Sequence, residues 1–456
     1  MSHRHKTFLA ESEKKVTDLE HRRKINFSLH QSDIAFKKGK DQFVDLEAIR
    51  QKAKNIKWEA IEHLHTYLKE FETAFTKNGG KVIWAENAQQ ALDKILEICK
   101  AKKAKSIVKS KSMVTEEIHL NKFLEDHAID VIETDLGEYI QQLAGEPPYH
   151  IVAPSMHKSK EDVAALFHEK LQVAPNLPPE QLTQVAREQL RQRYVDAEIG
   201  ITGVNYLLAD IGGVAVTENE GNARLTTSFP KTHIAIAGIE KVLPSVYDLD
   251  LFWPLLATFG SGQTLTVYNT IFTGPKQQNE TDGPEEMYVI LLDNGRTNIL
   301  SDTTARESLY CIRCGACLNV CPVFQNIGGH TYDTTYSGPI GAVITPHLRG
   351  IDEYKHLSNA STLCGSCTAA CPVHINLHEL LLYNRQKAVK ENYTSRAEKL
   401  AWYVWKRACL SRGMMNLAGG GIKNFVFSKL FTKAWGTHRR LPVFAKKSFN
   451  QQWEEQ

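Results

Sequence analysis

Long apolar runs are missing from this chain of 456 residues. No stretch of about 18 consecutive apolar residues occurs, so we expect no membrane-spanning helix. The first fifteen residues, MSHRHKTFLAESEKK, carry many charges and lack the apolar segment that a secretory signal requires. The sequence therefore predicts a cytoplasmic protein.

A strong imbalance of charge is also missing. The chain has 55 Lys and Arg residues against 52 Asp and Glu residues, a net charge of +3. This excess is too small to favour nucleic acid as a partner, and no motif of a nucleic-acid-binding module is present. The segment DIGGVAVTENEG (210–221) does not have the G-x-G-x-x-G spacing of a dinucleotide-binding turn. Neither a flavin nor a nicotinamide fingerprint is visible.

Cysteine is scarce outside one region of the chain. Seven of the nine cysteines lie between residues 311 and 371. A disulfide framework would spread its cysteines over a short secreted chain, whereas crowding in a large cytoplasmic chain favours a metal centre. The remaining two, Cys99 and Cys409, are most simply buried small apolar side chains.

Four regions follow one another along the chain. Residues 1–75 are charged and have helical periodicity. Residues 76–300 alternate helical segments with strand-like runs such as THIAIAGIEKVL and EEMYVILLDNG, which predicts an α/β domain with a parallel sheet. Residues 301–390 hold the crowded cysteines, and residues 391–456 form a tail.

The tail is basic and rich in aromatic residues. Between residues 396 and 447 it contains twelve Lys and Arg residues and one acidic residue, Glu398. Such a segment fits a helix packed on the cysteine region, a docking face for a partner protein, or a helix that lies on an anionic membrane surface.

The first cysteine run is YCIRCGACLNVCP. Its spacing, Cys311-x2-Cys314-x2-Cys317-x3-Cys321 followed by proline, is that of bacterial two-cluster ferredoxins. Three closely spaced thiolates on a turn can bind one iron–sulfur cluster. The fourth cysteine begins a segment that leads away from this turn, so its thiolate can bind the other cluster. Zinc is the competing interpretation, but zinc motifs usually pair two C-x2-C couples across a longer loop. The run therefore predicts iron–sulfur clusters.

The second run, STLCGSCTAACP (361–372), repeats this spacing with a serine, Ser361, in place of the first cysteine. Crossed ligation predicts one set of Cys311, Cys314, Cys317 and Cys371 and a second set of Cys321, Cys364 and Cys367. The second set suits either a [3Fe–4S] cluster or a [4Fe–4S] cluster whose fourth iron takes Ser361, water or another side chain. Cys409 is a further alternative ligand. Two neighbouring clusters are typical of electron transfer, and purely structural clusters are the alternative.

A polar loop, TENEGNAR (217–224), follows the strand-like run GGVAV. Open α/β sheets bind ligands at the carboxyl ends of their strands. Arg224 is a candidate for a two-pronged contact with a substrate carboxylate. Glu218 is a candidate nucleophile, because the loop is similar to the Ser-Glu-Asn-Gly loop of CoA transferases. Further candidates for this pocket are Asn219, Glu220, Asn222, Lys109, Lys111, Thr202 and Asp210. The alternative is a tight hydrogen-bonded turn with solvated charges.

With these residues the chain resembles the lactate utilization iron–sulfur protein B family over most of its length. The resemblance is carried by KSKSMVTEEIHLN (109–121), ETDLGEYIQQLAGEPPYHIVAPSMHK (133–158), ADIGGVAVTENEGNAR (209–224), SGPIGAVITP (337–346) and the three-cysteine second run.

The resemblance implies an α/β LUD domain, similar to the isomerase and CoA-transferase type of fold, followed by a mainly helical ferredoxin-like domain whose first cluster is [4Fe–4S]. It implies an electron-transfer role, with partner proteins A and C, in the oxidation of L-lactate to pyruvate by bacteria. A quinone-linked acceptor and a position at the inner face of the membrane would suit the basic tail. The alternative is an enzyme of CoA-transferase or isomerase type with structural or redox-sensing clusters.

Overall fold

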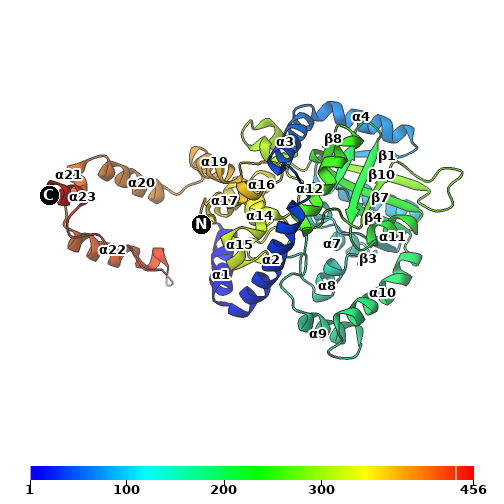
Figure 1. The fold of residues 1–456 in the computed structure, drawn as a ribbon, viewed down its shortest axis with the longest axis horizontal. Coiled ribbons are helices and arrows are strands. Elements are labelled where there is room, and N and C mark those ends of the chain that lie inside the picture. The colour runs from blue at the N-terminus through cyan, green and yellow to red at the C-terminus, as the bar shows by residue number, and fades with distance from the viewer. Residues whose placement is uncertain (1, 437–438, 456) are drawn as a thin grey trace. The chain divides into compact units, whose positions relative to one another are not determined.

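The computed structural model describes residues 2–436 and 439–455. The chain divides into two compact units, one up to residue 387 and one from residue 388 onward (Figure 1). The first unit contains two β-sheets, the helices around them and all seven crowded cysteines. The candidate sites therefore lie within a single unit.

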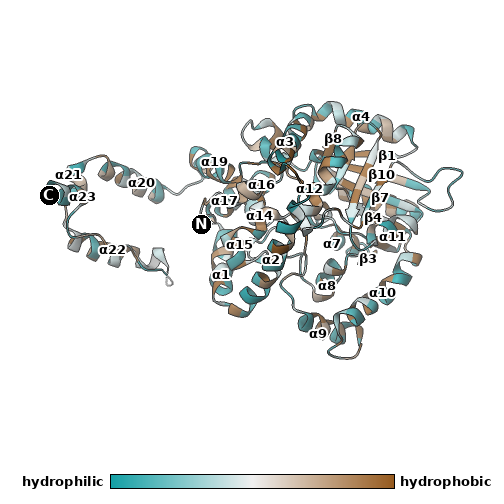
Figure 2. Ribbon diagram, in the orientation of Figure 1, coloured by the Kyte–Doolittle hydropathy of each residue, from teal (hydrophilic) through white to brown (hydrophobic). Residues whose placement is uncertain are grey.

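Six parallel strands form the main sheet, in the order β1-β10-β7-β4-β2-β3. Their bounds are β1 Lys81–Ala85, β2 Ser106–Lys109, β3 Asp130–Glu133, β4 Ile199–Gly203, β7 Thr232–Gly238 and β10 Glu286–Leu292. The central strands β7 and β10 are apolar along most of their length, the pattern of strands that are covered on both faces. Figure 2 shows the sheet strands in brown, the hydrophobic end of the scale. The predicted α/β domain with a parallel sheet is confirmed.

Helices cover both faces of this sheet, because successive strand residues point to opposite sides. On one face, Ile107 packs in a core to which α5 and α7 contribute, whereas on the other face Val108 packs in a core to which α8, α9 and α10 contribute. The helices of the domain are α5 Ala88–Lys102, α6 Met113–Glu117, α7 Leu120–Glu125, α8 Leu136–Ala144, α9 Lys160–Leu171, α10 Pro179–Asp196, α11 Asn222–Ser228, α12 Leu249–Ser261 and α13 Arg296–Ser301, with the 3-10 turns η1 Ile239–Lys241 and η2 Val246–Asp248.

A four-stranded sheet, in the order β8-β5-β6-β9, lies in the same domain. Its strands are β5 Tyr206–Leu208, β6 Gly213–Glu218, β8 Val242–Leu243 and β9 Tyr268–Phe272. The turn between β5 and β6 requires Gly212, which has a φ of +62° and whose added Cβ would come within 2.2 Å of the backbone nitrogen of Phe75. Strand β6 ends at Glu218 and so leads into the polar loop.

The N-terminal helices share one apolar core with the second sheet and the cysteine region. This core runs from Phe8 to Leu381. The N-terminal helices are α1 His3–Thr17, α2 Leu19–Lys40, α3 Leu46–Glu62 and α4 Leu64–Lys77. The cysteine region contains α14 Ala316–Asn319, α15 Pro322–Ile327, α16 Gly338–Arg349, α17 Ile351–Asn359, α18 Ser366–Ala370 and α19 Leu377–Lys390, with the 3-10 turns η3 Ala305–Tyr310 and η4 His330–Tyr332. The N-terminal helices thus help to build the surroundings of the cysteines.

The second unit consists of short helices: α20 Arg396–Cys409, α21 Arg412–Asn416, α22 Gly420–Trp435 and α23 Phe449–Glu454. No residue of α20 is buried, and Leu400, Trp402 and Trp405 on this helix are exposed. Over residues 2–436 and 439–455, no helix combines the length and the apolar character needed to cross a membrane.

A buried charge network joins the α/β domain to the cysteine region. Arg296 is only 1% exposed. It donates two hydrogen bonds to the carboxylate of Glu117, at 2.8 and 3.0 Å, and one to Glu240 Oε2 at 2.6 Å. From the cysteine region, Arg313 Nη2 lies 3.3 Å from Glu240 Oε1, and the Tyr336 hydroxyl donates to Glu117 at 2.6 Å. Every member has a partner of opposite charge or a hydrogen bond, which is the condition for stable burial of charge.

The network depends on charge compensation. Burial by itself would raise the pKa of Glu240, but the positive charges of Arg296 and Arg313 outweigh burial and lower it to about 2. Glu117 has a lowered pKa for the same reason, since Arg296 outweighs its burial. Both carboxyl groups are therefore ionised at neutral pH.

We expect Arg296→Met to destabilise the protein by about 3–5 kcal/mol. Glu117 would lose its ion pair with Arg296, and Glu240 would keep only its ion pair with Arg313. The measurement is the midpoint of thermal unfolding of the protein with its clusters bound. Arg224→Met is the matched control, since Arg224 is exposed and its side chain lies over the Tyr268 ring. An equal fall in both midpoints would contradict the assigned role of Arg296.

Candidate functional site

Four cysteines line one apolar cavity. Cys311, Cys314 and Cys317 come from the first run, and Cys371 comes from the second run, fifty residues later than Cys321 in the chain. Burial raises the pKa of Cys371 to about 12, and burial together with Cys311 raises the pKa of Cys314 and Cys317. Three of the four cysteines are buried and Cys311 is half-buried, and buried thiols become thiolates only when a bound cation compensates their charge. The donor set therefore fits an iron–sulfur cluster.

The loop that carries the first three sulfurs has an unusual backbone. Arg313 and Gly315 both have positive φ, at +62° and +77°. The backbone N–H of Arg313 donates to Cys311 Sγ at 3.4 Å, and that of Ile375 donates to Cys371 Sγ at 3.4 Å. Hydrogen bonds to ligand sulfurs are one of the means by which a protein sets a cluster potential.

The other three cysteines form a second group nearer to the surface. Burial and the neighbouring Cys321 and Cys364 raise the pKa of Cys367 to about 11. Cys364 is exposed, and hydrogen bonding with Ser366 lowers its pKa to about 7. Cys321, Cys364 and Cys367 thus lie close enough to act on one another electrostatically, and the other four cysteines line one cavity. The crossed ligand sets stay a prediction.

Ser361 belongs to the turn that precedes Cys364. Its hydroxyl accepts a hydrogen bond from the backbone N–H of Leu363 at 3.1 Å, and its carbonyl accepts one from Arg385 at 3.0 Å. Leu363 has a φ of +54°, which a non-glycine residue rarely adopts. The serine therefore has a structural role at this turn.

Helix α3 holds the second run in place. Arg50 donates to the carbonyl of Cys371 through Nη2 at 2.7 Å and through Nε at 3.1 Å, and to the carbonyl of Ala369 at 2.9 Å. Lys54 donates to the carbonyl of His374 at 3.1 Å. Sequence reasoning assigned no site residue to this helix, because the contacts join residues about 320 positions apart and leave no local pattern.

The two cysteines outside the runs differ from each other. Cys99 is fully buried in the core beside α5, as expected. Cys409 is exposed, so its interpretation as a buried apolar residue is wrong. It lies on α20, a helix whose apolar residues are not covered.

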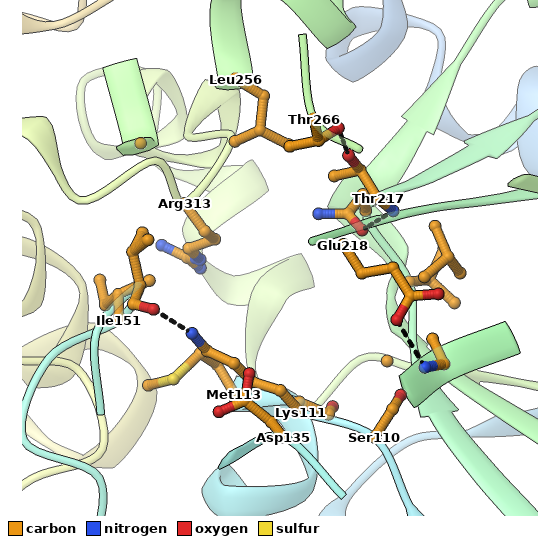
Figure 3. Close-up of a pocket in the computed structure, with 18 of the residues that line it drawn as sticks. Ser110, Lys111, Met113, Asp135, Ile151, Thr217, Glu218, Leu256, Thr266 and Arg313 are labelled. Atoms are coloured by element: carbon orange, nitrogen blue, oxygen red, sulfur yellow. Dashed lines mark hydrogen bonds between the residues drawn. The ribbon is translucent and has the colours of Figure 1, made fainter. Parts of the chain in front are cut away.

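A second cavity, of about 290 Å³, lies at the carboxyl ends of β2, β4 and β6 (Figure 3). The polar loop contributes Glu218, Asn219, Glu220 and Asn222 to its lining, and Lys111 follows β2 into the same cavity. Arg224, Lys109, Thr202 and Asp210 do not line it. The loop therefore helps to form a cavity, but only part of the candidate set does so.

The two candidate catalytic residues have other partners. The carboxylate of Glu218 accepts hydrogen bonds from the backbone N–H groups of Ala223 and Arg224, at 2.6 and 2.9 Å. It therefore holds the polar loop against the first turn of α11, and both oxygens are engaged. Arg224 is exposed and lies 5.3 Å from the centre of the Tyr268 ring. This geometry does not favour covalent chemistry at Glu218.

The other candidates have structural contacts. Lys109 is fully buried and forms ion pairs with Glu133 at 2.7 Å and Glu116 at 3.3 Å. Thr202 is hydrogen-bonded to His233 at 2.8 Å. Asp210 accepts a hydrogen bond from the hydroxyl of Ser245 at 2.7 Å.

Three residues that sequence reasoning did not select line the cavity: Arg313, Lys241 and Tyr336. Arg313 stands between two cysteines of the first run, so the cavity lies next to the four-cysteine group. The position of Arg313 inside the first cysteine run is the one feature of the sequence that could have marked it as a site residue. Lys241 and Tyr336 lie outside the polar loop, and neither was selected as a site residue from the segments around them.

Glu146, His157 and His330 also converge, with donor atoms within 4.8 Å of one another. His157 Nε2 already pairs with Glu146 at 2.9 Å, and His330 Nε2 with the carbonyl of Pro147 at 2.8 Å. Lys158 further compensates Glu146 at 2.9 Å. Because these contacts already engage all three residues, we assign them no metal.

The chain matches two domain families and several sequences that bear the name lactate utilization protein B. Residues 68–292 match the LUD domain and residues 307–375 match the 4Fe-4S dicluster domain. Lactate utilization protein B of Shouchella clausii is 44% identical over 415 residues, covering 88% of this chain and 87% of that protein. Lactate utilization protein B of Bacillus velezensis is 48% identical over 354 residues, covering 77% and 74%.

A crystal structure of a DUF162 family protein from Deinococcus radiodurans aligns with 50% of this chain and 98% of its own, at 13% identity and a TM-score of 0.30. This alignment is too loose to support an argument. The two domain matches and the observed architecture confirm the expected fold class, an α/β LUD domain followed by a mainly helical ferredoxin-like domain. From the extent and identity of the sequence matches, we conclude that the chain belongs to the lactate utilization protein B family.

Proposed function

We propose that this protein is the iron–sulfur electron-transfer subunit of a bacterial system that oxidises L-lactate to pyruvate. The observation that carries the proposal is the pair of cysteine groups, one mostly buried and one that includes the exposed Cys364, within a single compact unit. The name of the relatives, lactate utilization protein B, supports a role in lactate utilization. We further propose that the chain acts with lactate utilization proteins A and C.

The proposed ligands follow the two cysteine groups. Cys311, Cys314, Cys317 and Cys371 would hold a [4Fe–4S] cluster, and Cys321, Cys364 and Cys367 would hold a [4Fe–4S] or [3Fe–4S] cluster. Bound clusters of this kind supply one-electron redox chemistry. The second group supplies only three thiolates. It therefore suits a [3Fe–4S] cluster, or a [4Fe–4S] cluster whose fourth iron binds a ligand other than a thiolate.

The protein surroundings of the two groups differ in a way that suits electron transfer. Ile312, Ile340 and Val373 help to exclude water from the first group. The second group includes the exposed Cys364, which supports contact with a redox partner on that side. We propose four functional regions, 1–75, 76–300, 301–390 and 391–456, the last of which begins close to the division between the two compact units.

The first prediction concerns the whole function. Protein purified without oxygen should contain roughly seven or eight irons per chain and show a broad visible absorbance. Adding L-lactate together with proteins A and C should bleach this absorbance, whereas omitting either partner should prevent bleaching. One bound zinc and no visible absorbance would refute the proposal.

The second prediction concerns the crossed ligand sets. Cys371→Ala removes a thiolate from the first group although the residue belongs to the second run, so the iron content should fall by about half, to roughly four per chain. Cys409→Ala is the matched control, because this cysteine is exposed and lies in the tail. Electron paramagnetic resonance should show that the remaining signal belongs to the second cluster. Loss of the second cluster, with the first retained, would contradict crossed ligation.

We also propose that the basic tail docks on the anionic inner face of the membrane. Helix α20 carries exposed Trp402 and Trp405 next to Lys406 and Arg407, which combines apolar and basic contacts on one short helix. Such contacts would bring the protein near a quinone-linked acceptor.

Reversing two charges, in the variant with Lys406→Glu and Arg407→Glu, should weaken binding to phosphatidylserine vesicles at least tenfold, since each basic residue contributes about 1 kcal/mol at such a surface. The matched control reverses Lys37 and Lys38, two exposed lysines of α2. Vesicle co-sedimentation measures the difference. Equal binding by both variants, or tail-dependent capture of protein A or C in place of vesicles, would refute membrane docking.

A further inference from the structure

We propose that the 290 Å³ cavity between the LUD domain and the first cysteine run binds a small carboxylate anion, with Arg313, Lys241 and Lys111 as its cationic contacts. The anion class, a 2-hydroxy or 2-oxo acid of about three carbons, rests on the proposed function. The presence of an anion site rests on the cavity itself.

Arg313 provides the main argument. Its side chain is only 10% exposed, its Nη2 lies near Glu240, and its guanidinium lies 4.6 Å from the centre of the Tyr336 ring. Its Nη1 is buried and has no hydrogen-bond partner within residues 2–436 and 439–455. Figure 3 shows the guanidinium on the cavity wall opposite Thr217 and Glu218. A buried cationic donor without an acceptor is costly, and an anion in the cavity would remove that cost.

Lys241 adds a second positive charge, which interacts electrostatically with the carboxylate of Glu240. It is 6% exposed, lines the cavity, and has no hydrogen bond or ion pair with the residues that the structure describes. Burial, followed by the charge of Arg313, lowers its pKa to about 8. Lys111 donates to the carbonyl of Val152 and leaves its other ammonium protons available.

Three acidic residues also line the cavity: Asp135, Glu218 and Glu220. Both oxygens of Glu218 accept backbone hydrogen bonds, and Glu220 accepts one from the backbone of Leu136 at 2.9 Å. Burial and the nearby Asp135 raise the pKa of Glu220 to about 7, so this group is partly neutral near neutral pH. The cavity thus combines three cationic residues with acidic residues that accept backbone hydrogen bonds, a combination that suits an acid carrying a second polar group.

The cavity is also connected with the first cysteine group. Arg313 lines both the anion cavity and the four-cysteine cavity, and it stands between Cys311 and Cys314. An anion paired with Arg313 would add negative charge beside the first cluster. Since net charge near a cluster helps to set its potential, binding should make the midpoint potential of the first cluster more negative.

The test uses the full chain with both clusters bound, in the absence of partner proteins. Isothermal titration with L-lactate and with pyruvate should show binding of at least one acid, and lactamide, which lacks the carboxylate, should not bind. Arg313→Gln should weaken binding at least about tenfold, because it removes a charged hydrogen-bond donor. Arg224→Gln is the matched control and should bind like the unaltered protein.

Two further measurements keep the test decisive. Lys241→Met lies outside the cysteine runs, so it can report on anion binding even if Arg313→Gln fails to hold its clusters. In a redox titration, the bound acid should shift the first cluster and leave the second cluster unchanged, and Arg313→Gln should abolish the shift.

Absence of binding by both acids, or equal binding by the unaltered protein and by Lys241→Met, would overturn the proposed anion site. If the clusters are present and accept electrons, the proposed electron-transfer role would survive that result. Failure of the unaltered protein to hold clusters would refute the electron-transfer role whatever its affinity for acids.

Discussion

Compensation of buried charge is the constraint on which the structure depends. Arg296 is enclosed between Glu117 and Glu240, and Glu240 also pairs with Arg313 from the first cysteine run. Because an uncompensated buried charge costs several kcal/mol, these groups must stay together once the core has formed. The network therefore determines where the loop of the first cysteine run, which contains Arg313, meets the α/β domain.

The position of the cysteine loop has a direct consequence for the candidate sites. Arg313 contributes to the charge network, to the wall of the four-cysteine cavity and to the wall of the 290 Å³ cavity. A single residue thus links the fold, the proposed cluster ligands and the proposed anion site. The same junction is closed from another side by α3, whose Arg50 holds the backbone of the second run.

Much of the architecture could be predicted from residue patterns. Continuous apolar runs such as β7 and β10 indicate strands covered on both faces, and the 2-2-3 spacing of the first run indicates iron–sulfur ligation. The pocket was harder to predict. Glu218 and Lys111 were expected at the carboxyl edge of the sheet and lie there, whereas Arg224 points to the surface and stacks on Tyr268. A loop sequence indicates which side chains are polar, but not the side to which each one turns.

The sequence by itself determined the elements and the chemistry of the ligands, because periodicity and cysteine spacing are local properties of the chain. The tertiary structure alone decided which residues share a site. Arg50 and Cys371 are 321 positions apart, and Lys241 and Arg313 meet at the cavity only because the η1 turn and the cysteine loop pack together. The physical reason is that burial and charge compensation act through space, between segments whose separation along the chain carries no pattern.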